Sequence, residues 1–277
     1  MKRILLISLI FFAFAEAKLT AQDFTGVATY KSRRAVDIKM GGNMSDEMKK
    51  QMEEQMKKQF EKEFTLTFNA SESLYTENEK LDAPSMPSSN GMVIKVIESR
   101  DVLYKNTRLG TFVNQQDLMG KQFLVQDSLS NDKWTLEKET KNIGDYLCYK
   151  ATMEKTYTTM EFNSEDEDSD GLKEIEKTKT ITVWYTPQIP VNNGPSTYYG
   201  LPGLILEVQD DKLSLLCSSV VLNPKEKPEI IAPDKGKKVS QDEFKKIQKE
   251  KMEEMTARMK SNRKSGNGES IEIRIGG

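Results

Sequence analysis

The chain has 277 residues, with 41 Lys and Arg against 43 Asp and Glu, so its formal net charge is −2 at pH 7. It contains 0 histidines, which excludes Ser-His-Asp and Cys-His catalysis, ordinary catalytic zinc sites and imidazole acid–base chemistry. A mildly acidic chain also has no electrostatic reason to bind nucleic acid. We therefore expect a protein that is not an enzyme, that needs no cofactor and that has no nucleic-acid partner.

The first residues have the pattern of a secretory signal peptide, which we place at residues 1–21. Lys2 and Arg3 precede an apolar run over residues 4–14, which is too short to span a bilayer. Cleavage after Ala17 and cleavage after Ala21 both fit, and the second leaves Gln22 directly before the first strand-like segment. No later stretch is apolar enough for a membrane helix, so we expect an exported protein in the periplasm, in the cell envelope or secreted, without a transmembrane segment in the mature chain.

Residues 22–223 are predicted to form a single β domain. Residues 24–32 form the first strand-like run, and residues 64–69 alternate strictly between apolar and polar side chains. Short strand-like runs separated by turns continue to residue 222, and this spacing is typical of an antiparallel sheet. The expected fold is mainly β with minor α: a curved antiparallel sheet, comparable by analogy to the half-barrel of periplasmic lipoprotein carriers.

Two helices are expected outside the sheet. The first, near residues 45–63, is a helical insertion that is rich in methionine, because Met40, Met44, Met48, Met52 and Met56 recur at every fourth position. Thioethers could coordinate Cu(I), but no Cys or His joins this stripe, and an apolar helix face that packs against the sheet or a partner is the favoured interpretation.

The second expected helix lies in residues 224–277, which we divide into a charged linker, a helix and a flexible tail. Ser240-Gln241-Asp242-Glu243 is a capping box, and the helix is predicted to run from there to about Met259.

Two further sets of residues permit alternative interpretations. Cys148 and Cys217 could form a disulfide after export, or remain two buried free thiols. Asp166, Asp168 and Asp170 match the opening of a calcium-binding loop. Because the twelfth position of that loop is Lys177 and not the required Glu, an acidic hairpin tip is favoured over a calcium site.

A turn-rich loop that leads into an apolar strand is the most distinctive stretch of the chain. Its motif residues are Gly194, Pro195, Gly200, Leu201, Pro202, Gly203, Leu204 and Ile205. Around it lie Trp184, Tyr185, Tyr198 and Tyr199, which together with Leu201 could line a ligand- or partner-binding surface, or fasten the loop to its own core. If Gly203 holds a positive φ, a β-branched residue at this position would be strained and Gly203→Val would destabilise the fold.

The motif resembles the signature of the GLPGLI family of exported bacterial proteins. Trp184-Tyr185-Thr186 precedes the loop at that family's spacing, and the strand with Cys148 before Lys150-Ala151 is similar as well. The resemblance covers residues 24–223 and implies an uncharacterised envelope protein, without an established activity or catalytic residues. We therefore predict a non-catalytic envelope protein that binds an apolar ligand or an envelope partner. The alternative is a metal-responsive protein that binds calcium or copper.

Overall fold

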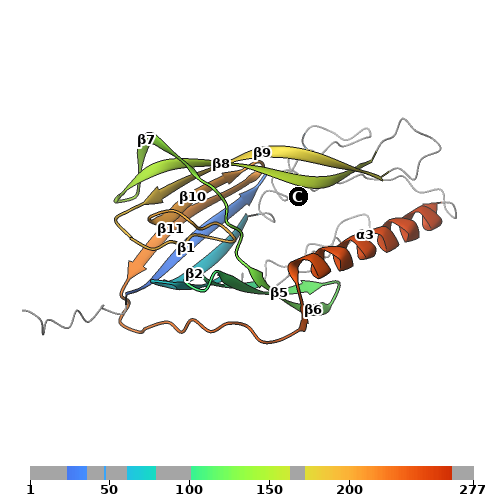
Figure 1. Cartoon of the computed structure of the whole chain (residues 1–277), viewed down its shortest axis with the longest axis horizontal. Coiled ribbons are helices and arrows are strands. Elements are labelled where there is room, and N and C mark those ends of the chain that lie inside the picture. Colours follow the sequence, from blue (N-terminus) through green and yellow to red (C-terminus); the bar gives the residue numbers. More distant parts are fainter. Residues whose placement is uncertain (1–23, 36–46, 48–60, 79–100, 163–171, 264–277) are drawn as a thin grey trace, which may run out of the picture.

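The structure is a computed structural model that describes residues 24–35, 47, 61–78, 101–162 and 172–263 (Figure 1). The predicted signal peptide, the methionine stripe from Met40 to Met56, and the acidic residues Asp166, Asp168 and Asp170 lie outside the described residues. These predictions are therefore not tested by the structure.

The prediction of a mainly β fold with minor α is confirmed. Strands and one helix make up the described elements: β1 (Thr25–Arg34), β2 (Glu61–Asn69), β3 (Glu72–Glu77), β4 (Val102–Asn106), β5 (Thr111–Leu118), β6 (Lys121–Ser128), β7 (Thr135–Ile143), β8 (Tyr146–Phe162), β9 (Leu172–Thr186), β10 (Leu204–Asp210), β11 (Leu213–Leu222), β12 (Lys237–Val239) and α3 (Gln241–Arg263). All strands join one 12-stranded sheet in the order β12-β6-β5-β4-β3-β2-β1-β11-β10-β9-β8-β7.

The connection between β6 and β7 requires the sheet to curl. These strands lie ten positions apart in the sheet, which would separate them by about 48 Å if the sheet were flat. Residues 129–134 join them, and this stretch can reach only about 23 Å when fully extended. The two edges therefore approach each other across an opening that this connection crosses (Figure 1), and the sheet is open and curved, not a closed barrel.

Alternation along the strands places apolar side chains inside the curve. In β1 and β2 the side chains of Ala28, Tyr30, Leu66 and Phe68 are buried, while the residues between them are more exposed. Pairing is antiparallel throughout except between β12 and β6, which run parallel.

Residues 187–203, which connect β9 to β10, fill the inside of the curve. Ile189 and Val191 pack in the cluster that contains Tyr30 and Phe68. Tyr198 and Leu201 pack in a second cluster with apolar residues of β8, β9 and β10. The connection therefore supplies core side chains to both halves of the sheet.

Two elements extend past the body of the sheet. β8 and β9 form a long ribbon, and α3 projects toward the same end of the molecule (Figure 1). The predicted capping box of α3 is confirmed, because the backbone NH of Glu243 donates to Ser240 Oγ and the backbone NH of Ser240 donates to Glu243 Oε2. The segment before α3 is more than the predicted linker, because it contributes β12 to the sheet edge.

Candidate functional site

The strongest polar feature of the structure lies under residues 193–203, which carry the sequence motif and are called the signature loop below, and it was not predicted from the sequence. Lys105 of β4 is fully buried, with 0% exposure. Its Nζ atom donates to three backbone carbonyl oxygens of the loop: Gly194 at 2.8 Å, Ser196 at 2.7 Å and Tyr198 at 3.2 Å. One side chain thus binds the carbonyl groups of every second residue from Gly194 to Tyr198.

The geometry around Lys105 matches its charged form. An ammonium group has three N–H donors, and three carbonyl acceptors surround it. Burial acts in the opposite direction and lowers the pKa of Lys105 to about 7, because the charged form loses its hydration. Among the ion pairs between described residues, none involves Lys105, so carbonyl dipoles take the place of a carboxylate.

Neighbouring strands hold the same loop. Ser73, the Cα partner of Lys105 on β3, donates through its Oγ to Asn193 Oδ1 at 3.1 Å. That Asn193 oxygen also accepts the backbone NH of Gly194 at 2.9 Å. The Tyr30 hydroxyl of β1 donates to the Ile205 carbonyl at 2.7 Å, at the start of β10. These buried bonds satisfy polar groups that the loop brings into the core.

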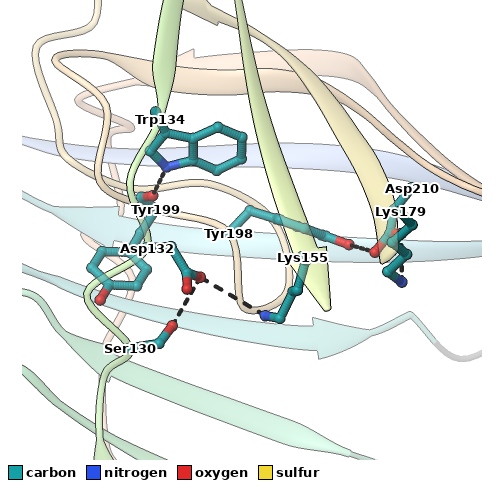
Figure 2. Close-up of polar contacts among 8 residues, drawn as sticks. All are labelled: Ser130, Asp132, Trp134, Lys155, Lys179, Tyr198, Tyr199 and Asp210. Carbon is teal, nitrogen blue, oxygen red and sulfur yellow. Dashed lines mark hydrogen bonds and ion pairs between the residues drawn. The ribbon is translucent and has the colours of Figure 1, made fainter. Parts of the chain in front are cut away.

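A second group of contacts holds the loop from the side of the opening (Figure 2). Trp134 Nε1, at the end of the 129–134 connection, donates to the Tyr199 carbonyl at 2.8 Å. Near it, Asp132 accepts from Ser130 Oγ at 2.9 Å and pairs with Lys155 at 3.8 Å. The loop is therefore fixed to the segment that crosses between the two sheet edges.

Asp210 at the end of β10 anchors the loop through Tyr198 (Figure 2). The Tyr198 hydroxyl donates to Asp210 Oδ2 at 2.6 Å, and Lys179 Nζ lies 2.6 Å from Asp210 Oδ1. Burial, reinforced by the bond to Asp210, raises the pKa of Tyr198 well above its usual value, so this phenol is neutral near neutral pH.

The glycines of the motif allow close backbone approach. A Cβ atom at Gly203 would lie 2.2 Å from the Thr186 carbonyl oxygen, and one at Gly194 would lie 2.8 Å from Ile205 Cβ. Gly203 does not have a positive φ, which was the condition for backbone strain in G203V; in this motif the positive glycine φ is that of Gly200, at 101°. Gly203 is constrained by contact between the two segments and not by a left-handed backbone conformation.

The five residues predicted to bind a ligand or partner divide into two groups. Tyr185, Tyr198 and Leu201 have exposures of 5%, 8% and 2% and pack together in one core cluster. Trp184 and Tyr199 are half-buried. Lys141 Nζ lies 4.3 Å from the ring centroid of Trp184, so a cation from this chain already occupies that ring face.

The two cysteines are free thiols in the structure, and both are buried in the cluster around Tyr30. Burial raises the pKa of Cys148 to about 11 and that of Cys217 to about 12. They belong to β8 and β11, with β9 and β10 between them in the sheet. The disulfide stays a prediction that a thiol assay can test.

Within the described ranges, no cluster of three or more His, Cys, Asp or Glu side chains is arranged to hold a metal ion. The same part of the chain contains no helix with the length and apolar character needed to cross a membrane.

Residues 134–207 match a known family model. Its description is "Protein of unknown function (Porph_ging)". The matched segment begins at Trp134 and includes the whole signature loop, whereas Lys105, Tyr30 and Asp210, which hold the loop, lie outside it. Comparison with curated proteins found no match.

Comparison with solved structures gives alignments with TM-scores below 0.5. The structure of PNGF-II in space group C2 aligns with a TM-score of 0.46 and 16% identity, over 81% of this chain and 32% of that chain. The structure of PNGF-II in space group P21 aligns with a TM-score of 0.45 and 17% identity, over 80% of this chain and 32% of that chain. The chain thus spans about a third of the length of PNGF-II. An uncharacterized conserved protein from Thermus thermophilus aligns with a TM-score of 0.32 and 7% identity, over 79% of this chain and 92% of that chain.

Proposed function

We propose that this chain is an exported, non-catalytic envelope protein of the GLPGLI type that acts by binding another envelope protein. The observation that carries the proposal is the use of the signature loop inside the fold. Its Tyr198 and Leu201 side chains are core residues, and its carbonyls are bound by Lys105. Because the loop fills the curve of the sheet, binding at an outer surface is favoured over an apolar ligand held within the curve.

The polar groups of the loop region support a structural role. Lys105 is held by carbonyls, and Asp210 is held by Tyr198 and Lys179. General acid–base or nucleophilic catalysis needs a titratable group that can reach a substrate. These groups are instead engaged with the protein itself, which agrees with a protein that is not an enzyme.

The β8–β9 ribbon is the surface that we assign to the partner. β7 pairs with β8 only as far as Thr152, and β10 pairs with β9 only as far as Ile181. The hairpin continues from the Glu154–Thr180 pair to the Phe162–Leu172 pair. Among the described strands none flanks this outer part, and a strand edge of this kind can pair with another protein.

Substitutions on the ribbon test this proposal. Thr158 and Thr180 are exposed on the ribbon, and Thr140 is an exposed threonine on β7 that serves as the matched control. Each would be changed to Lys in the full chain, because Glu176 and Glu154 lie opposite Thr158 and Thr180, and the variants would be cross-linked in the native envelope and analysed by mass spectrometry. We expect T158K and T180K to lose a cross-linked envelope protein that wild type and T140K retain. Retention by all variants would exclude the ribbon, and recovery of a co-purified lipid without any protein would favour an apolar ligand.

The metal-responsive alternative rests on the sequence of Asp166, Asp168 and Asp170 for calcium and on the methionine stripe for copper. Thermal unfolding with and without Ca²⁺ or Cu⁺ distinguishes it from protein binding. A shift in unfolding temperature with Ca²⁺ that disappears in the triple Asp→Asn variant would favour the metal-responsive function. Unfolding curves that superimpose with either ion would exclude it.

A further inference from the structure

The edge strand β6 is apolar and is covered by a small unit from the C-terminal part of the chain. Phe123 and Val125 of β6 are buried together with Val239 of β12 and Phe244 of α3. The rings of Phe123 and Phe244 meet edge-on, with centroids 5.3 Å apart. Without this cover, an apolar sheet edge would be open to pairing with another chain.

The contact between this covering unit and the sheet is short. β12 pairs with β6 through three residues, Lys237, Lys238 and Val239. The backbone NH of Gln241 adds one bond to Asp127 Oδ2 at 3.1 Å. Beyond Ile247, α3 has no buried side chain among those described. The unit is thus held by few groups compared with the strands inside the sheet.

The segment that links the unit to the sheet is long and contains three prolines. Residues 223–236 have no regular secondary structure and no buried residue, and include Pro224, Pro228 and Pro233. The segment runs along one side of the molecule from β11 to β12 (Figure 1). These strands lie seven positions apart, at most about 34 Å because the sheet curls, and the segment can reach about 50 Å when fully extended. Such a linker can reach a neighbouring molecule as well as its own sheet.

We propose that two copies of this chain exchange the β12–α3 unit, residues 237–263, so that β12 of each copy pairs with β6 of the other. The occupant of each edge is then a second copy of the same segment, which is already complementary to β6 in shape and register. Exchange of identical elements is a low-cost route to a dimer, because the contacts within each covered edge are unchanged.

α3 provides the reason for the dimer to be favoured. Met255 is 42% exposed, although it is a large apolar side chain. Met255 lies about three turns beyond Phe244, on the same side of the helix. In the exchanged dimer each α3 packs on the second molecule, which can bury the exposed part of Met255.

A cysteine pair at the Asp127–Gln241 contact tests the exchange directly. The full-length double variant D127C/Q241C would be oxidised and run on a non-reducing gel. An exchanged dimer gives a covalent dimer, whereas a closed monomer gives an internally cross-linked chain at monomer mass. Mixing and refolding of the single variants D127C and Q241C should give a covalent heterodimer, while Q241C mixed with T140C should not. Only monomer-mass product from the double variant would overturn the proposal.

Linker length gives a second measurement. Deletion of residues 226–234 reduces the reach between Leu222 and Lys237 to about 20 Å, which hinders closure onto the same sheet but not onto a neighbour. Light scattering should show a higher dimer fraction at a given concentration. Insertion of four Gly and Ser residues at the same place should lower it. A dimer fraction that neither change alters would contradict exchange.

Discussion

Lys105 Nζ lies 2.7 Å from the carbonyl oxygen of Ser196, a residue whose φ of 51° places it in the left-handed region. A non-glycine residue in that region is held there by its surroundings. The contact shows what those surroundings are: a buried ammonium group on β4 orients the peptides of the loop. Strand and loop are therefore parts of one folding unit, although they are far apart in the sequence.

Replacement of Lys105 by Met should strongly destabilise the protein. The side chain is of similar length, but three buried carbonyls would lose their donor, and each unsatisfied group costs about 1–3 kcal/mol. We expect the free energy of unfolding in urea to fall by about 3–5 kcal/mol. Lys31→Met, on the exposed side of β1, is the matched control and should change stability by less than about 0.5 kcal/mol. A K105M variant as stable as this control would show that the carbonyls are satisfied in another way.

Lys105 should also make stability depend on pH. Burial lowers its pKa in the folded state to about 7, against about 10.4 when unfolded. Between these values the unfolded chain binds more protons, so the free energy of unfolding of wild type relative to K105M should rise with pH from about 7 to about 10. The carbonyl bonds favour the charged form and reduce the size of the rise. A flat difference across this range would mean that the carbonyls fully offset the burial.

Gly203→Val should be destabilising for steric reasons. The new Cβ would lie 2.2 Å from the Thr186 carbonyl oxygen, which is backbone and cannot rotate away. We expect a loss of at least about 3 kcal/mol, or a fall in unfolding temperature of about 6–12 °C for a protein of this size. Pro202→Ala, at the exposed neighbouring position, should change the unfolding temperature by only a degree or two. Equal unfolding temperatures for G203V and P202A would disagree with this close approach.

Thiol titration should find two cysteines that react only after unfolding. Cys148 and Cys217 are buried free thiols, and burial raises the pKa of each, so the native protein should react slowly with a thiol reagent. In denaturant without reductant we expect two equivalents to react. Zero equivalents, rising to two after reduction, would instead establish the disulfide.

The sequence was sufficient to predict the class of fold, because strand periodicity repeats along most of the chain. In β4 the same periodicity puts Lys105 on the side of Leu103 and hence in the core. The periodicity of β4 was not sufficient to predict a buried Lys105, because lysine is almost never fully buried and the carbonyl acceptors of Lys105 belong to a loop far away in the sequence. β12 was missed because three residues are too few to show a period.

The cause of the glycine constraint could not be predicted either. The motif indicated that glycine is required at position 203. A positive φ and a close backbone contact both require glycine, so the sequence does not distinguish between them. The distinction depends on Thr186 lying against Gly203, which is a property of the folded chain.

The place of β1 in the sheet has a consequence for how the chain folds. β1 pairs on one side with β2 and on the other with β11, where Gly26 lies opposite Leu222. Contacts between such distant parts of a chain form slowly, because a long loop must close before they are made. During synthesis, the edge of β1 that pairs with β11 therefore stays unpaired until nearly all strands of the sheet have left the ribosome. A chain that stops before β11 would keep that edge open, so the centre of the sheet is completed only near the end of synthesis.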